Sequence, residues 1–128
     1  MTQNDVYDYV YEDVIAAFPT SYISGVYEPL PPSFPAVFIR EIGRRTVEAN
    51  VTFSGSQGVK DSTFEVQIQS NDPNAAKTEA YEIMQVVEQS FEKLFYIQTA
   101  MNPIEGDTYR LVATFRRVIG SADEMPEG

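Results

Sequence analysis

The strict alternation of polar and apolar residues in residues 63–69, TFEVQIQ, restricts the fold of this chain more than any other feature. In an extended strand, Phe64, Val66 and Ile68 lie on one side and the polar residues between them on the other. The segment 46–53, TVEANVTF, repeats the pattern. Strands with one apolar side indicate an antiparallel sheet that has one covered face and one face in contact with solvent.

Three further segments have strand character. Residues 36–42, AVFIREI, form a mostly apolar run, and Gly43 is expected at a bend between this strand and the one at 46–53. Residues 95–104 and 108–120 are expected to pair as a hairpin, because a short segment with Gly and Asp separates them. The chain therefore supplies enough strands for a sheet of ordinary size.

Two segments have the 3.6-residue periodicity of amphipathic helices. The first covers residues 5–18, and it is expected to be capped by Thr2 or Asn4 and to end at Pro19. The second covers residues 73–94 and follows an Asp-Pro pair that is typical of a helix start. Each helix has an apolar stripe with which to cover a sheet.

The 128 residues are enough for one domain with a single core. We expect an α+β fold in which two amphipathic helices pack on one face of a mainly antiparallel sheet. The domain is expected to span residues 1–120, with a stiff proline-rich arm at 19–35, a protruding β-loop at 54–61 and an acidic flexible tail at 121–128. The uncovered face of the sheet is expected to carry Glu48, Asn50, Thr52, Glu65, Gln67, Gln69, Arg110, Thr114 and Arg116.

Composition excludes several classes of function. The chain has no cysteine and no histidine, which excludes cysteine nucleophiles, thiolate or imidazole metal ligands and histidine-based catalytic triads. A net charge of −10 disfavours binding to phosphate backbones. No apolar run approaches the roughly 20 residues of a membrane span, and the N-terminus has no export signal. We expect no cofactor, no metal and no membrane, and a protein that is not exported from the cytoplasm in which it is made and assembled.

The charges are segregated along the chain. Residues 1–39 contain no Lys or Arg, whereas six of the nine basic residues are arginines in the predicted strands. Such bipolarity suits a protein that stacks against copies of itself or against oppositely charged neighbours. The alternative is cross-strand pairing of these arginines with acidic residues of the same chain.

Four segments have a characteristic order and spacing: ISGVYEPLPPSFPAVFI (23–39), TFEVQIQSN (63–71), AAKTEAYEIMQVVEQSFEKL (75–94) and NPIEGDTYRLVATFRRVIG (102–120). Through these segments the sequence resembles the tail terminator family of long-tailed bacteriophages, whose members are also known as tail completion or minor capsid proteins. The resemblance extends from Asp5 to Gly120. Two features depart from the family pattern: the second helix ends in Leu94-Phe95-Tyr96 without a glycine, and the tail 121–128 is additional.

The resemblance implies a structural virion protein and not an enzyme. Members of the family form a hexameric ring that caps the tail tube, stops its polymerisation and provides the surface to which the head connector joins. The implied partners are other copies of the chain, the tail tube protein and a head–tail connector or neck protein, with DNA only in transit. We expect the lumen of such a ring to be acidic, because a wall that repels phosphate does not retain DNA.

Eleven residues are expected at contacts between subunits or with the tube. The arginines are expected to pair with carboxylates of a neighbouring subunit or of the tube protein, and the loop 54–61 to extend across a subunit boundary or onto the tube. Val86 is expected to be an exposed apolar residue on the second helix. These residues are Arg40, Arg44, Arg45, Gly55, Gln57, Gly58, Lys60, Val86, Arg110, Arg116 and Arg117.

Two other functions are compatible with the residues. One is a ring protein on the head side of the neck, since small α+β proteins recur there. The other is a cellular binding module, or a carboxylate-dependent hydrolase that uses Glu48 and Glu65. An enzyme of that kind needs a concave pocket with convergent polar groups, whereas a ring subunit needs extended flanks.

Overall fold

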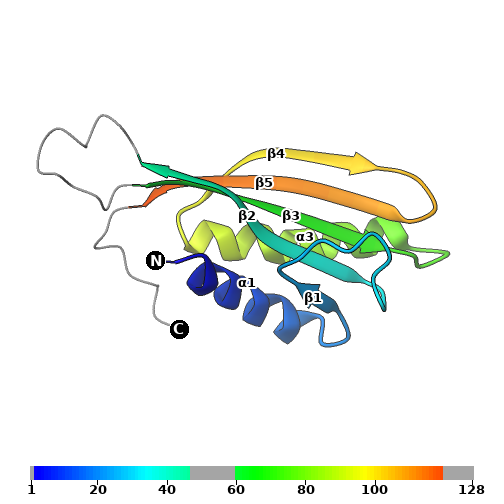
Figure 1. The fold of residues 1–128 in the computed structure, drawn as a ribbon. Coiled ribbons are helices and arrows are strands. Elements are labelled where there is room, and N and C mark those ends of the chain that lie inside the picture. The colour runs from blue at the N-terminus through cyan, green and yellow to red at the C-terminus, as the bar shows by residue number, and fades with distance from the viewer. Residues whose placement is uncertain (1, 47–59, 120–128) are drawn as a thin grey trace, which may run out of the picture.

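The computed structural model describes residues 2–46 and 60–119 of the chain. In this part of the chain, two α-helices pack on one face of a five-stranded sheet of order β1-β2-β3-β5-β4 (Figure 1). Neighbouring strands are antiparallel except for β1 and β2, which confirms the predicted α+β fold in one domain. The elements are α1 (Gln3–Ala17), β1 (Tyr22–Ser24), β2 (Ala36–Thr46), β3 (Lys60–Ser70), α3 (Ala76–Lys93), β4 (Ile97–Ile104) and β5 (Tyr109–Ile119).

Thr2, one of the two predicted caps, caps helix α1 at its N-terminus. The Thr2 hydroxyl accepts a hydrogen bond from the Asp5 amide at 3.2 Å, and the Asp5 carboxylate accepts one from the Thr2 amide at 2.8 Å. This reciprocal capping box satisfies two amides that have no partner within the helix. The buried stripe of α1 consists of Val6, Val10 and Val14, each completely inaccessible to solvent.

Helix α3 begins three residues later than the periodicity predicts. The Asp72 carboxylate accepts hydrogen bonds from the amides of Asn74 and Ala75 at 2.8 and 2.9 Å. These bonds hold residues 73–75 in a turn, so that regular helix starts only at Ala76.

Val86, in the middle of α3, is predicted to be exposed, and this prediction is wrong. Its side chain is half-buried and packs against the core.

Helix α3 ends in a Schellman motif that has phenylalanine where glycine is usual. The Phe95 amide donates to the Glu92 carbonyl at 2.9 Å, and the Tyr96 amide donates to the Phe91 carbonyl at 3.0 Å. Phe95 has a φ of 64°, in the left-handed region. A side chain in this conformation costs on the order of 1–2 kcal/mol relative to right-handed backbone, and the Phe95 ring is 73% exposed.

An aromatic cluster fills the core between α3 and the sheet. The rings of Phe91 and Phe115 are stacked, with centroids 4.3 Å apart and planes inclined by 6°. Phe64 and Tyr96 pack on the Phe91 ring at 5.6 and 5.3 Å. Offset stacks and tilted pairs of this kind add to the free energy that burial of the rings supplies. The cluster ties the C-terminal half of α3 to β3 and β5.

Strand β2 continues through Gly43, so the bend predicted there is wrong. The register of β2 against β3 shifts between Glu41 and Gly43, which makes Ile42 the extra residue of a β-bulge. The extra residue changes which positions face the helices. Ile39 is buried in the core before the bulge, and after it Arg44, three residues beyond Glu41, shares the helix-covered side with that residue.

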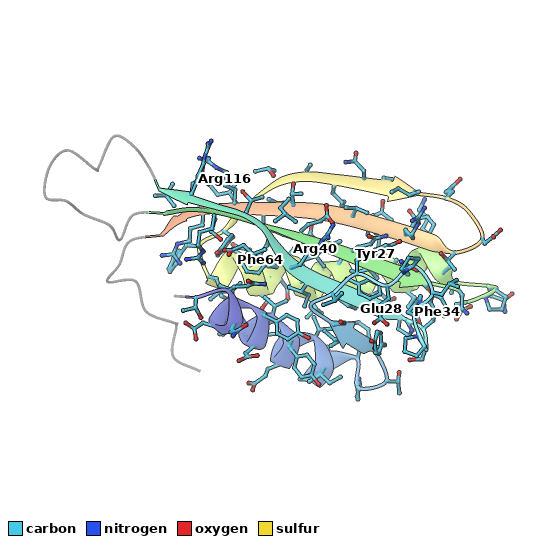
Figure 2. The ribbon with its side chains drawn as sticks, viewed as in Figure 1. Tyr27, Glu28, Phe34, Arg40, Phe64 and Arg116 are labelled. Carbon is cyan, nitrogen blue, oxygen red and sulfur yellow. The ribbon has the colours of Figure 1, made fainter. Side chains whose placement is uncertain are left out.

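The proline-rich arm folds onto the outer face of the sheet, opposite the helices. Phe38 lies on that face and is only 1% exposed, because the rings of Tyr22 and Tyr27 stand edge-on to it at 6.3 and 5.4 Å. The Tyr22 hydroxyl donates a hydrogen bond to Glu28, which fastens the arm. Figure 2 shows Tyr27, Glu28 and Phe34 grouped beside the first residues of β2.

The arm explains one error in the predicted outer face. Gln67 and Gln69 are buried, although the alternation of β3 predicts that both face solvent. Gln67 pairs with Phe38 and Gln69 with Ala36, in the part of β2 that the arm covers. Several predicted features lie outside the described residues: residues 47–53 of the strand predicted at 46–53, residues 54–59 of the loop predicted at 54–61, and the tail 121–128. Glu48, Asn50 and Thr52 lie outside them too.

Candidate functional site

The arginines predicted at an interface lie on two different faces of the sheet. Arg40, Arg45 and Arg116 lie on the outer face, where they pair across strands with Glu65 and Asp61. Arg44 and Arg117 lie on the helix-covered face. The structure therefore gives several of these arginines partners within the chain, as the cross-strand alternative predicts.

Asp61 of β3 is shared by two arginines. Arg116 donates to its two carboxylate oxygens at 2.8 and 2.7 Å, and Arg45 approaches the second oxygen at 3.3 Å. The Arg116 hydrogen bonds hold the pKa of the Asp61 carboxyl below its ordinary value, although burial acts in the opposite direction. The Asp61 side chain is 7% exposed, whereas that of Arg45 is 81% exposed. Arg116 is thus the main partner of Asp61, and most of the Arg45 guanidinium faces solvent.

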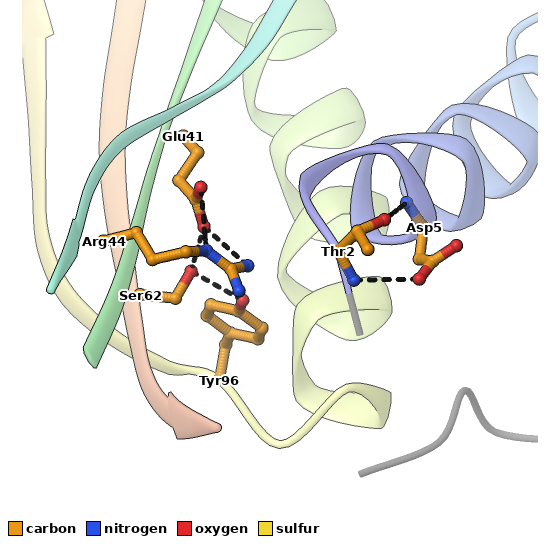
Figure 3. A network of polar contacts seen from close by, with 6 residues as sticks. All are labelled: Thr2, Asp5, Glu41, Arg44, Ser62 and Tyr96. Carbon is orange, nitrogen blue, oxygen red and sulfur yellow. Dashed lines mark hydrogen bonds and ion pairs between the residues drawn. The ribbon is translucent and has the colours of Figure 1, made fainter. Parts of the chain in front are cut away.

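A polar network crosses the helix-covered face at the same end of the sheet (Figure 3). The Ser62 hydroxyl donates to Glu41 at 2.6 Å and lies 2.9 Å from the Tyr96 hydroxyl. Arg44 pairs with Glu41 at 2.9 Å, a contact between residues three apart that the bulge in β2 makes possible. Burial raises the pKa of Tyr96. The network joins β2, β3 and the start of β4.

Arg117 closes the C-terminal end of α3. Its guanidinium donates to the Leu94 carbonyl at 2.6 Å and lies 5.5 Å from the centroid of the Phe95 ring. A cation at this position interacts favourably with the negative end of the helix dipole and with the face of the ring. Arg117 therefore has a structural role inside the subunit.

The remaining predicted interface residues are scattered. Arg110 lies near the opposite end of β5, between Gln69 and Ile104 in the strand register. Lys60 begins β3, and Gly55, Gln57 and Gly58 lie outside the described residues. Of the predicted interface residues, the structure brings Arg45 of β2 and Arg116 of β5 together at Asp61. Arg44 lies next to Arg45 in β2 but on the opposite, helix-covered face.

The edge strand β4 is exposed along its whole length, and it is missing from the predicted interface residues. All eight residues of Ile97–Ile104 are exposed, and none of them is charged. Ile97 is 71% exposed and lies two residues after the exposed Phe95. Proteins ordinarily protect edge strands with charge, proline, bulges or cover. Strand β4 has Pro103 and an irregularity after Gln98, but it has no charge, and its exposed apolar side chains indicate a contact surface. The absence of charge over residues 97–104 is a signal that the sequence alone already contains.

A groove opens beside this strand on the helix-covered side. It has a volume of about 220 Å³, and Glu88 and Glu92 of α3 form its acidic rim. Tyr96, Gln98 and Phe115 complete its wall, and we refer to these five residues as the α3–β4 groove. The groove combines carboxylates with aromatic side chains, a combination that suits a guanidinium.

Two larger clefts of the described chain are lined mainly by polar residues. One, of about 410 Å³, lies where the turns around Asp72 and Glu105 meet, and another, of about 350 Å³, contains the Asp61 cluster. Glu65, one half of the predicted hydrolase pair, is bound to Arg40 at 2.8 Å, and Glu48 lies outside the described residues. Residues 2–46 and 60–119 contain no group of three acidic side chains placed to hold a metal ion.

The described helices include none that is long and apolar enough to cross a lipid bilayer. Comparison of the sequence with protein-family models and with curated proteins gives no match.

Proposed function

We propose that this protein is a structural ring subunit of the virion, of the tail terminator kind. Copies of the chain assemble into a hexameric ring that caps the tail tube, stops its polymerisation and presents a joining surface to the head connector. The protein acts through its surfaces and carries out no chemical reaction.

The observation that carries this proposal is the exposed and uncharged edge strand β4. A monomer with a net charge of −10 has ample charge to protect an edge strand, yet residues 97–104 have none. An uncharged, exposed strand flanked by Phe95 is what a subunit needs if this edge is covered in an assembly. The resemblance of the sequence to tail terminators supports this kind of assembly.

The charge of the chain fits the passage of DNA through the ring. Six copies, each with a net charge of −10, make the assembly strongly acidic. An acidic lumen repels the phosphate backbone and lets DNA pass without being held. A basic lumen in the assembled ring contradicts this part of the proposal.

The test is the molar mass of the protein by light scattering, alone and after mixing with purified tail tubes, together with negative-stain images of the tube ends. A hexamer, or a monomer that forms a cap at the tube end, is expected. A protein that leaves the tubes bare overturns the terminator function and favours a ring on the head side of the neck.

A further inference from the structure

The two long edges of the sheet have opposite chemical character. The strand order places β2 near one edge and β4 at the other. On the first, β1 pairs only with Ala36–Phe38 of β2, and no other strand of the described chain pairs with that side of β2 beyond Phe38. The exposed side chains there are Arg40, Ile42 and Arg45, which we call the β2 edge.

The β2 edge consists of an apolar residue between two cations. Ile42 is the extra residue of the bulge and is 49% exposed. Arg45 is held only at 3.3 Å, by a carboxylate oxygen to which Arg116 already donates at 2.7 Å. A guanidinium has five donors in a planar fork, so Arg45 keeps most of its capacity for a second carboxylate.

The opposite edge has the complementary pattern. Phe95 and Ile97 are exposed apolar residues at the start of this edge, where Ile97 lies opposite Arg116 on the outer face and Arg117 contacts the Phe95 ring. On the helix-covered side of the same edge, Glu88 and Glu92 line the α3–β4 groove. The β2 edge thus presents the guanidinium groups of Arg40 and Arg45, and the groove at the opposite edge presents the carboxylates of Glu88 and Glu92. Surfaces of this kind match each other and do not match themselves, because like charges repel in a two-fold contact.

We propose that the β2 edge of one copy docks on the α3–β4 groove and the start of β4 of the next copy. Ile42 contacts Ile97 and Phe95, and Arg45 reaches the carboxylates of Glu88 and Glu92. The occupant of the groove is a second copy of this chain, and this assignment rests on the proposed ring function. The contact is head-to-tail and repeats around a ring.

Side chains make this contact, and the two edge strands do not pair through a continuous ladder of backbone hydrogen bonds. The edge of β4 is interrupted by Pro103, which has no amide hydrogen, and by an irregularity between Gln98 and Ala100. The edge of β2 is interrupted by its own bulge at Ile42. Two strands with breaks at different places cannot form a regular ladder, so the apolar residues at their centres make the contact.

Phe95 fits this role because its conformation is costly for folding. Glycine is the usual residue at the left-handed position that ends α3, yet the chain has an exposed phenylalanine there. Strained residues of this kind concentrate at functional sites. The aromatic ring at the rim of the groove is an anchor of the type that dominates interfaces.

The chain contains no cysteine, so every cross-link between introduced cysteines reports a contact of the introduced residues and none arises from native thiols. The variant with Ile42→Cys and Ile97→Cys in one chain is treated with a short bismaleimide and separated on a denaturing gel. A ladder of covalent oligomers is expected, because each copy links to the next at both edges. The matched control has Leu30→Cys, at a site that is 92% exposed, in place of Ile42→Cys, and is expected to give at most a trace of dimer.

Two results overturn the proposed contact. One is the absence of a ladder for the 42–97 pair, both in solution and on tube ends. The other is efficient dimerisation of Ile97→Cys alone, because this indicates that two β4 edges meet about a two-fold axis. Circular dichroism of each variant verifies that it is folded, which is expected since both isoleucines are substantially exposed.

Charge reversal in the groove gives an independent readout. Glu92→Arg places a cation opposite the incoming Arg45 and is expected to weaken self-association by about tenfold or more. Glu82→Arg, also exposed on α3 but outside the groove, is the control and is expected to leave self-association within about twofold of the wild-type value. Equal effects of the two substitutions contradict the contact.

These outcomes separate the interface from the proposed function. Tubes that are capped by a protein without the 42–97 link retain the terminator function and overturn the interface. A 42–97 ladder in a protein that ignores tubes supports the interface and overturns the terminator function.

Discussion

The guanidinium of Arg116 on β5 donates two hydrogen bonds, of 2.8 and 2.7 Å, to the carboxylate of Asp61 on β3. The two residues are far apart in the sequence, and the antiparallel register of β3 and β5 brings them together. A bidentate pair of this kind is stronger and more directional than a single hydrogen bond. It fixes the end of the sheet from which Arg45 projects.

Replacement of Asp61 by asparagine is expected to destabilise the fold by on the order of 1–3 kcal/mol. The change removes the charge from a carboxyl that is 7% exposed and weakens both hydrogen bonds from Arg116. Urea unfolding monitored by circular dichroism measures the loss. Glu12→Gln, on the exposed side of α1, is the control and is expected to change stability by less than about 0.5 kcal/mol. Equal stabilities of the two variants contradict the structural role of Asp61.

The same carboxylate predicts a dependence of stability on pH. The pKa of Asp61 in the folded chain lies below its ordinary value of 3.8, so the folded chain binds this proton more weakly than the unfolded chain. The carboxylate therefore stabilises the fold fully above pH 3.8, and this contribution declines as the pH falls toward and through the lower folded pKa.

Unfolding free energies of wild type and Asp61→Asn, measured between pH 6 and pH 2.5, test this expectation. Other acidic groups, such as Asp5 in its capping box, contribute equally to both proteins and cancel in the difference. The stability difference between the two proteins is expected to shrink as the pH falls below about 4. A difference that is constant over the whole range means that Asp61 has an unperturbed pKa.

At position 95, glycine is expected to give a more stable protein than alanine, by about 1 kcal/mol. Both substitutions remove the ring and its contact with Arg117, so they differ only in the backbone preference at φ 64°. Thermal unfolding of Phe95→Gly and Phe95→Ala measures the difference. At an ordinary helical position the order is reversed, so an alanine variant that is the more stable of the two contradicts the left-handed conformation.

Truncation of Phe91 to alanine is expected to cost about 3–5 kcal/mol. The substitution removes the ring that stacks on Phe115 and contacts Phe64 and Tyr96, and it leaves a cavity in the centre of the core. Chemical denaturation compares this variant with Leu30→Ala, which removes a side chain that is 92% exposed. If both variants unfold at the same urea concentration, the aromatic cluster does not hold the helix on the sheet.

Periodicity in the sequence predicts most of the fold. The stripes of α1 and α3 and the alternation in β3 repeat often enough to specify the type of element and its buried side. The boundaries are less accurate, as the late start of α3 after the Asp72 turn illustrates. Two local hydrogen bonds from backbone amides to the Asp72 carboxylate moved that boundary without a change in the periodic pattern.

The errors come from events that periodicity does not encode. One inserted residue at Ile42 turned an expected bend into a bulge. The burial of Gln67 and Gln69 depends on where the proline-rich arm lies, which is a tertiary property. At the candidate site, the positive charge of the arginines was enough to select them as expected interface residues. Their partners depend on the strand register, which places Arg116 within hydrogen-bond distance of Asp61.

The bulge at Ile42 means that the number of residues, as well as their type, determines the surface charge of β2. If the same sequence ran through β2 in plain alternation, without the bulge, Arg44 would lie on the outer face and Arg45 on the helix-covered face. Arg45 would turn toward the helices and away from Asp61, while Arg44 would leave Glu41. One residue that stands outside the strand register thus sets the electrostatic pattern of this edge.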